Sequence, residues 1–200
     1  MKPLNIVFAT TCKGRAHHLK ETLPRNLCDN PNAKFVILNY NSADDLQRYV
    51  MENHKPDIDS GRLVLYSTYE PEKFAMAHSK NLAHRLAIIE GADVVCNLDA
   101  DNFTGRRFDE YLQREFAAAA FCGREYFMWA RMIKGALDRG INGRMAVTRN
   151  AFLMAGGYDE KYSSWGPDDE DFKVRLRMLG FESAEIDPRY LRAVKHTDKA

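Results

Sequence analysis

The sequence has 200 residues, of which 45% are hydrophobic, 11% aromatic and 28% charged. This composition is typical of a folded domain and excludes disordered, collagen-like and coiled-coil classes. The 29 basic and 28 acidic residues leave a formal net charge of +1, so the chain as a whole has no general attraction to nucleic acid or anionic membranes.

Cysteine spacing and apolar runs bear on where the protein works. The four cysteines, at positions 12, 28, 96 and 122, form no CxxC pair, which argues against a zinc site or a disulfide framework and favours reduced thiols. The longest apolar runs, 35–38 and 116–122, are far shorter than the roughly 20 residues of a membrane-spanning helix. A strand-like segment begins too early for a signal peptide. We therefore expect a cytoplasmic protein without a membrane span.

Short apolar segments alternate with helical ones up to residue 102. The predicted strands are 6–9, 34–38, 62–66 and 93–98, and the predicted helices are 17–27, 44–53 and 75–89. Near-continuous apolar strands that alternate with helices are typical of a parallel sheet covered on both faces. Such sheets bind ligands beyond the carboxyl ends of their strands. The polar residues that follow each strand are therefore the candidates for function.

The pattern changes after residue 102. The predicted helices are 108–121, 150–155 and 171–179, the predicted strands are 126–131 and 143–148, and Gly156-Gly157 predicts a tight turn. Gly180 is a typical helix stop. No linker or repeat interrupts the sequence, so we expect one domain over 1–200, with an α/β half at 1–102 and an α+β half at 103–200.

A pair of aspartates follows the fourth predicted strand, in Asn97-Leu98-Asp99-Ala100-Asp101-Asn102. If the strand continues, residues two apart point to the same face, so Asp99 and Asp101 lie together. Two such carboxylates can bind a hard cation and leave coordination positions for phosphate oxygens. The alternative is a polar turn, since Asp and Asn are common turn formers.

Four consecutive acids, residues 168–171, follow Trp165-Gly166-Pro167. Carboxylates favour helix N-termini, and Asp168 with Asp171 has the spacing of a capping box. Because four clustered like charges repel one another, one of them is also a candidate general base for a hydroxyl nucleophile. Trp165 is either a stacking platform for a sugar ring or a core tryptophan. His196 by itself is typical of a structural or exposed histidine.

The order of these motifs resembles that of glycosyltransferases with the GT-A fold, of a family 2-like type. The second half is most similar to the β-1,4-galactosyltransferase and chondroitin-polymerase type, which carries Gly-Gly-x-Asp-Glu and Trp-Gly-x-Glu-Asp motifs. The resemblance extends from Val7 to His196. It implies a Rossmann-like, mostly parallel central sheet flanked by helices, with a nucleotide-sugar-binding half at 1–102 and an acceptor-binding and catalytic half at 103–200.

The resemblance also implies roles for individual residues. Asp99 would contact the nucleotide ribose or metal-bound phosphates, and Asp101 would ligate Mn²⁺ (or Mg²⁺) together with His196. Asp169 would be the catalytic base of an inverting reaction. Acceptor contacts are implied at Trp165, Gly166, Asp168 and Glu170. Contacts to the nucleotide sugar are implied at Thr10, Thr11, Arg15, Asn39, Asn41, Lys80 and Asn81.

The sequence departs from the family pattern at two places. Pro167 and Asp168 stand where relatives usually have Gly and Glu, so the acceptor loop can differ in shape. Asn39 ends the second predicted strand where many relatives have a uracil-binding Asp, which leaves Asn39, Asn41 or Asp44 as base contacts.

These features together predict a metal-dependent, inverting glycosyltransferase that moves a sugar from a nucleotide sugar, expected to be a UDP-sugar, to an acceptor hydroxyl. The expected acceptor is a glycan, a glycolipid or another hydroxyl-bearing molecule, including modified DNA. The alternatives are a sugar nucleotidyltransferase, which needs no acceptor-side base, and a catalytically inactive carbohydrate-binding protein on the same fold. A basic stretch either holds an anionic acceptor or is a solvated face; it comprises Arg124, Arg131, Lys134, Arg139, Arg144 and Arg149.

Overall fold

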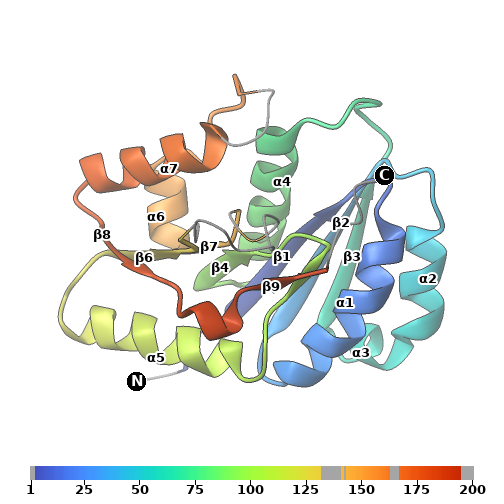
Figure 1. Cartoon of the computed structure of the whole chain (residues 1–200), viewed down its shortest axis with the longest axis horizontal. Coiled ribbons are helices and arrows are strands. Elements are labelled where there is room, and N and C mark those ends of the chain that lie inside the picture. Colours follow the sequence, from blue (N-terminus) through green and yellow to red (C-terminus); the bar gives the residue numbers. More distant parts are fainter. Residues whose placement is uncertain (1–2, 132–140, 142, 163–166, 195–200) are drawn as a thin grey trace.

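The computed structural model describes residues 3–131, 141, 143–162 and 167–194. A sheet with the strand order β3-β2-β1-β4-β7-β6-β8 runs through its centre (Figure 1). β7 is antiparallel to β4 and β6, and the other pairs are parallel. The strands are β1 (Ile6–Cys12), β2 (Lys34–Tyr40), β3 (Leu63–Thr68), β4 (Val94–Asn97), β6 (Tyr126–Trp129), β7 (Met145–Thr148) and β8 (Glu182–Glu185). The predicted α/β fold with a mostly parallel sheet is confirmed.

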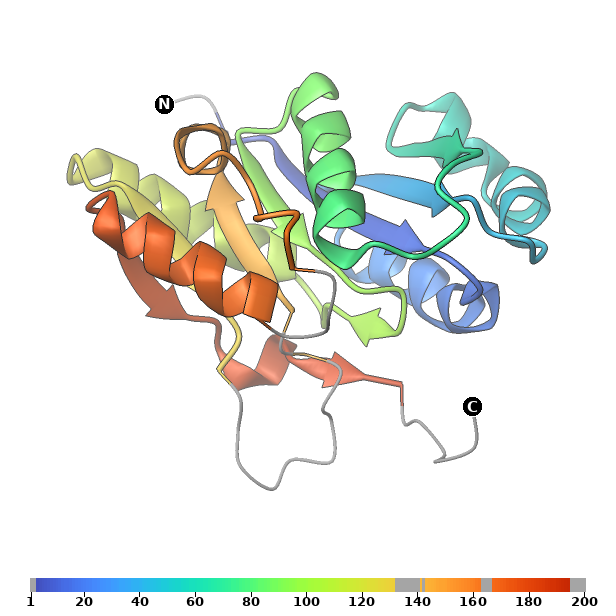
Figure 2. The ribbon, with the colours of Figure 1, turned by 90° about the horizontal axis from the view of Figure 1, so that it is seen from above.

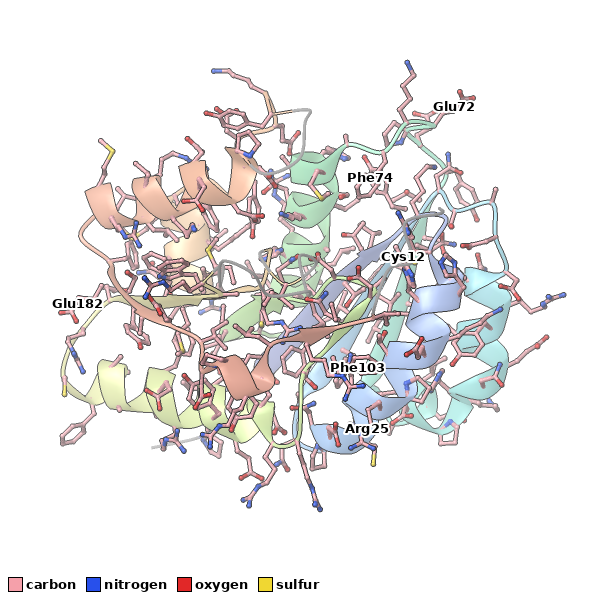
Figure 3. All side chains as sticks on the ribbon, in the orientation of Figure 1. Cys12, Arg25, Glu72, Phe74, Phe103 and Glu182 are labelled. Carbon is pink, nitrogen blue, oxygen red and sulfur yellow. The ribbon has the colours of Figure 1, made fainter. Side chains whose placement is uncertain are left out.

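Helices cover both faces of this sheet (Figures 1 and 2). One face carries α1 (Ala16–Asp29), α2 (Leu46–Asn53), α3 (Lys55–Asp59) and α5 (Phe108–Phe121), and the other carries α4 (Met76–Ile89), α6 (Arg149–Met154) and α7 (Pro167–Met178). Successive residues of a strand point to opposite faces. Phe8 of β1 accordingly stacks on Phe108 of α5 at 5.8 Å, whereas its neighbours Val7 and Ala9 pack in the core formed with α4. Side chains fill both layers (Figure 3).

A second, small sheet pairs β5 (Asn102–Phe103) with β9 (Arg192–Ala193). The 3₁₀ helix η2 (Pro188–Tyr190) precedes β9. The main-chain N–H of Val194 donates to the carbonyl of Asp101 at 2.8 Å. The small sheet therefore brings the C-terminal segment beside the turn that follows β4.

Three features of the fold correct or extend the predicted elements. β4 ends at Asn97, so Asp99 and Asp101 do not share a strand face; they lie in a turn in which Asn102 N–H donates to the Asp99 carbonyl at 2.9 Å. Helix α7 begins at Pro167 rather than at 171, because proline suits the first helical position and acids stabilise the first turn. The short elements α3, β5, β8, β9 and η2 had no clear sequence pattern.

Within the described ranges, no helix is both long enough and apolar enough to cross a membrane.

Candidate active site

An ion-paired cluster joins α4 to the start of α7. Lys80 Nζ lies 2.8 Å from Asp168 Oδ2 and 2.7 Å from Asp169 Oδ1. Lys80 is 4% exposed and Asp168 is 1% exposed, so both charges are withdrawn from water. The shared lysine offsets the repulsion between Asp168 and Asp169. These two acids therefore have an ion-pairing role in addition to any stabilisation of the helix start.

Asp99 lies close to Asp169, on the other side of Gly143. A Cβ atom added to Gly143 would lie 3.0 Å from Asp99 Oδ2 and 3.5 Å from Asp169 Oδ2. Asn97 Nδ2 donates to Asp99 Oδ1 at 3.1 Å and to the Gly143 carbonyl at 3.0 Å. Because Gly143 has no side chain, both carboxylates can approach this part of the main chain closely, and a Cβ atom there would crowd Asp99.

Burial perturbs the ionisation of this cluster. Burial raises the pKa of Asp169 to about 6; Lys80 opposes that rise and the charge of Asp168 adds to it. Burial likewise raises the pKa of Asp99; the charge of Lys80 lowers it and the charge of Asp101 raises it further. For Lys80, burial lowers the pKa, but the carboxylates outweigh it and the pKa is raised overall. Asp169 is thus poised to exchange a proton near neutral pH, as a general base requires.

Asp99 and Asp101 supply oxygen ligands of the kind that Mg²⁺ and Mn²⁺ prefer. A buried carboxylate whose ionised form is disfavoured, such as Asp99, gains from a bound cation. Among the described residues, no group of three or more His, Cys, Asp or Glu side chains could hold a metal ion. A metal held only by Asp99 and Asp101 would need further ligands from elsewhere, such as phosphate oxygens.

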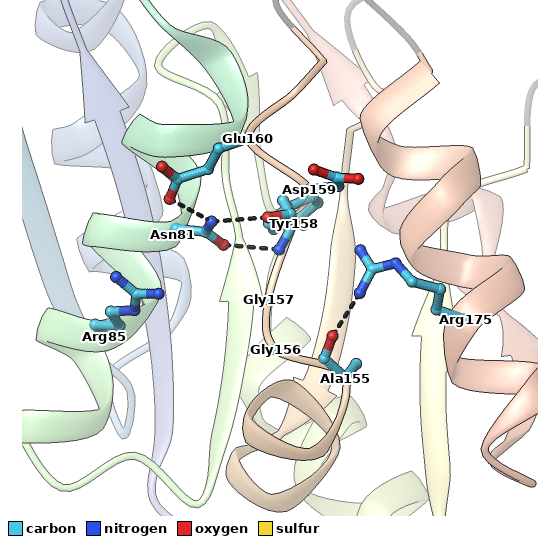
Figure 4. Close-up of a pocket in the computed structure, with 9 residues that line it drawn as sticks. All are labelled: Asn81, Arg85, Ala155, Gly156, Gly157, Tyr158, Asp159, Glu160 and Arg175. Carbon is cyan, nitrogen blue, oxygen red and sulfur yellow. Dashed lines mark hydrogen bonds between the residues drawn. The ribbon is translucent and has the colours of Figure 1, made fainter.

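Asn81, the neighbour of Lys80 on α4, holds the loop that follows α6. Its Nδ2 donates to the Tyr158 carbonyl at 2.9 Å and to Glu160 Oε1 at 2.8 Å, and its Oδ1 accepts from Tyr158 N–H at 2.7 Å (Figure 4). These residues line an open pocket of about 530 Å³ with Arg85 and Arg175 on opposite sides. None of Asp99, Asp101, Asp168 and Asp169 lines it, so it is distinct from the carboxylate cluster.

Gly157 is required by this arrangement. Its φ is +76° and an added Cβ would lie 2.4 Å from Asn81 Oδ1. We expect Gly157→Ala to lower the free energy of unfolding by about 2–5 kcal/mol, from backbone strain and overpacking together. Gly156→Ala is the matched control, because Gly156 has a φ of +73° with nothing within 4 Å; it should cost only about 1–2 kcal/mol. Urea unfolding measures both, and equal losses would contradict the role of the Asn81 contact.

The predicted nucleotide contacts Thr10 and Thr11 belong to the carboxyl end of β1, which Cys12 marks in Figure 3, and Arg15 follows that strand. Thr10 is buried, and Thr11 Oγ1 donates to the Ser79 carbonyl of α4 at 3.1 Å. Arg15 is half-buried at the N-cap of α1. These residues remain predicted contacts.

The predicted base contacts after β2 are held by their own hydrogen bonds. Asn39 Oδ1 accepts from Ser42 N–H at 3.0 Å, and its Nδ2 donates to Ser67 Oγ at 3.3 Å. Asn41 Nδ2 donates to the Pro71 carbonyl at 3.3 Å. Asp44 Oδ2 accepts from Ala16 N–H at 2.9 Å and so joins this loop to the start of α1. A nucleotide base would have to replace some of these bonds.

The structure describes only some of the predicted acceptor contacts. Glu170 is exposed and pairs with Lys173, and Asp168 lies buried behind Asp169. Trp165, Gly166 and His196 lie outside the described residues, so their predicted roles stay predictions.

The expectation of one basic surface is wrong for Arg144. Its side chain is fully buried, so it belongs neither to a solvated face nor to a surface that binds an acceptor. Arg124 and Arg131 pair with Glu182 and Glu185 on β8, and Arg149 is exposed on α6. Lys134 and Arg139 lie outside the described residues.

Sequence reasoning missed Gly143, Asn102 and Tyr158 as residues of this region. The Tyr158 hydroxyl and Asp168 Oδ1 are both buried, and neither has a hydrogen-bond partner among the residues that the structure describes. The Gly143-Arg144 pair at the start of a predicted strand was a usable signal, since a glycine there often marks a close approach of another group. Nothing in the sequence pattern marked Tyr158 apart from its place in Gly-Gly-Tyr-Asp-Glu.

Comparison with known families places the second half of the chain. Residues 128–198 match the family model described as the N-terminal domain of galactosyltransferase. This range contains Gly143, the acids 168–171 and the segment that pairs with β5. No curated protein matches the sequence.

Solved structures share the whole fold at low sequence identity. The mannosyltransferase PcManGT from Pyrobaculum calidifontis, solved with GDP-Man and Mn²⁺, is 16% identical with a TM-score of 0.75, over 100% of this chain and 59% of that one. S. aureus TarS 1–349 is 11% identical with a TM-score of 0.67, over 94% and 59%. Its complex with UDP is 12% identical with a TM-score of 0.62, over 92% and 61%.

The chain thus spans about three fifths of the length of these structures. The resemblance predicted from the motif order is confirmed by both kinds of match. The chain has the GT-A glycosyltransferase fold, with a C-terminal part that resembles the galactosyltransferases.

Proposed function

We propose that this chain is a metal-dependent glycosyltransferase that moves a sugar from a nucleotide sugar to an acceptor hydroxyl with inversion of the anomeric centre. The observation that carries the proposal is the closeness of Asp169, held by Lys80 at 2.7 Å, to Asp99: both carboxylates lie against the position that a Cβ atom of Gly143 would occupy. A proposed base and a proposed phosphate-side carboxylate thus lie close together.

Each residue has a chemical role in this proposal. Asp169 takes the proton of the acceptor hydroxyl as the oxygen attacks the sugar carbon, and Lys80 keeps Asp169 ionised. Asp99 and Asp101, with His196, would hold Mn²⁺ or Mg²⁺. When bound, such a cation neutralises the negative charge that develops on the departing diphosphate. Asp168 accepts a hydrogen bond from Lys80 Nζ and so helps to orient the lysine.

A nucleotide-sugar donor is supported by similar folds that were solved with GDP-Man and with UDP. We propose a UDP-sugar as the donor and test GDP-mannose beside it, because Asn39 replaces the family's uracil-binding Asp and its amide is already engaged. The proposed acceptor is a glycan, a glycolipid or another hydroxyl-bearing molecule, and a cytoplasmic location remains part of the proposal.

The decisive experiment incubates the protein with Mn²⁺ and a panel of UDP-sugars and GDP-mannose, and measures release of the nucleoside diphosphate. Mass spectrometry of added glycan, glycolipid and modified-DNA acceptors then detects transfer. Release of a nucleoside diphosphate from one donor supports the proposal. Release of pyrophosphate from a nucleoside triphosphate would instead show a nucleotidyltransferase, and binding without any release would show an inactive carbohydrate-binding protein.

The ionisation of Asp169 predicts the pH dependence of the reaction. A base works only when deprotonated, so kcat/KM should fall below a pKa of about 6. Lys80 opposes protonation of Asp169, so its removal raises the pKa. In Lys80→Met, we therefore expect the acidic limb of the pH–rate profile to move upward by roughly one to three pH units. Lys80→Arg, which keeps the charge, should restore most of the profile.

Lys34→Met is the matched control for this prediction. Lys34 also forms a partly buried ion pair, with Glu90, but at the other end of α4. The Lys34→Met variant should therefore leave the acidic limb of the pH–rate profile unchanged. An unshifted limb in Lys80→Met, with measurable turnover, would remove Lys80 from the tuning of the base.

A further inference from the structure

Arg144 is a buried charge that the proposed reaction does not use directly. Its side chain is fully buried and its guanidinium lies 5.8 Å from the ring centre of Phe108. Within the described part of the chain, its Nε has no hydrogen-bond partner. Burial of a charge is costly unless other groups compensate it. The groups that Arg144 binds therefore indicate why it is there.

Arg144 bonds to two segments that meet beside the aspartate turn. Its Nη2 donates to Asn102 Oδ1 at 2.9 Å, and its Nη1 donates to the carbonyl of Tyr190. Asn102 begins β5, and Tyr190 ends η2, just before β9. One guanidinium thus joins strand β5 to the end of the 3₁₀ helix that precedes β9.

Asn102 passes this constraint to Asp101. The Asn102 side chain is fully buried, and its Oδ1 is turned toward the Arg144 donor. The amide nitrogen is therefore the atom that faces Asp101, and it donates to Asp101 Oδ1 at 2.8 Å. The main-chain N–H of Asn102 also closes the turn onto the Asp99 carbonyl.

The backbone on the other side of Asp101 is held by β9. Asn102 pairs with Ala193, and Val194 N–H donates to the Asp101 carbonyl at 2.8 Å. Arg144 is thus linked both to the side chain of Asp101, through Asn102, and to the C-terminal segment, through Tyr190.

We propose that Arg144 and Asn102 are positioning residues for the metal site: through Asn102, Arg144 fixes the direction of the Asp101 carboxylate, and through Tyr190 it keeps the C-terminal segment beside it. The inference rests on the metal dependence in the proposed function. Groups that orient a metal ligand typically change metal affinity by roughly 10–100-fold when they are removed.

The test measures Mn²⁺ affinity directly, by the electron paramagnetic resonance signal of free Mn²⁺, in the presence of UDP and separately of GDP. Arg144→Met and Asn102→Leu should each weaken Mn²⁺ binding by roughly 10–100-fold. Arg144→Lys, which keeps the buried charge, guards against loss of folding and should also bind Mn²⁺ more weakly. Arg149→Met is the matched control, since Arg149 is exposed on the helix after β7; it should bind normally.

The double variant Arg144→Met with Asn102→Leu separates positioning from stability. Replacing both hydrogen-bond partners with apolar groups removes most of the cost of an unpaired group, so its urea midpoint should recover relative to the single variants. Its Mn²⁺ affinity should stay as weak as theirs. Recovery of affinity together with stability would overturn the inference and leave Arg144 a structural residue.

Wild-type binding separates failure of this inference from failure of the proposed function. If the wild type binds Mn²⁺ and the variants bind equally well, the positioning role is wrong and the metal site stands. If the wild type binds no Mn²⁺ with either nucleotide, the metal dependence is wrong and the inference falls with it.

Discussion

We expect the Asp169→Asn variant to lose roughly 10²–10⁴-fold in kcat, the usual contribution of a general base. Asparagine keeps the size of the side chain and can still accept from Lys80, so the contact between α4 and α7 is retained. What is lost is the proton acceptor beside Asp99. Because this loss affects only the transition state, kcat and kcat/KM should fall together. Steady-state kinetics with the active donor measure kcat and kcat/KM. Calorimetry of nucleotide binding checks that the loss is confined to the transition state.

The control for this variant is Asp171→Asn, two residues further along the same helix. Asp171 pairs with Arg175 at 2.7 Å, away from Lys80, so its loss should cost stability and little rate. Near-normal transfer by Asp169→Asn, with transfer lost in Asp168→Asn or Glu170→Gln, would show that the base is misassigned by one position. The Pro167 departure from the family pattern would then account for the shift by one position.

The fold was largely predictable because the strands of its first half contain short, nearly continuous apolar runs at regular separations. Phe35, Val36, Ile37 and Leu38 of β2, for example, are all fully buried, which is the pattern of a strand covered on both faces. The short elements β5, β8 and β9 were not predictable. β8 reads Glu-Ser-Ala-Glu and is mostly exposed, so its pairing with β6 depends on tertiary context rather than on a hydrophobic pattern.

The candidate site was predictable in its residue types and less so in its contacts. The acids at 99, 101 and 168–171 followed from motif order, but the sequence could not show that Lys80 bridges Asp168 and Asp169. That ion pair joins residues 88 and 89 positions apart, and no local pattern encodes such a contact. The same holds for Arg144, whose burial against Asn102 and Tyr190 reverses the surface role that its neighbours in sequence suggested.

Among the tests of metal dependence, the Asp101→Ala variant has the largest expected effect. Loss of this proposed ligand should abolish Mn²⁺-dependent donor hydrolysis, since stabilisation of the leaving diphosphate by a cation contributes several kcal/mol, or roughly 10³-fold in rate. EDTA should have the same effect on the unmodified protein, and added Mn²⁺ should restore it. Donor hydrolysis measured with and without EDTA tests both.

Three comparisons make this result specific to a metal ligand. Asp59→Ala removes an exposed aspartate that pairs with Lys55 on α3, so hydrolysis should be unchanged. His196→Ala should weaken Mn²⁺ affinity by roughly 10–100-fold, and excess Mn²⁺ should then recover part of the rate. Asp101→Ala should not recover at any Mn²⁺ concentration, because the proposed metal ligand itself is gone. Full activity of the unmodified protein in EDTA would remove the metal from the mechanism and leave Lys80 as the cation nearest to the cluster of Asp99, Asp168 and Asp169.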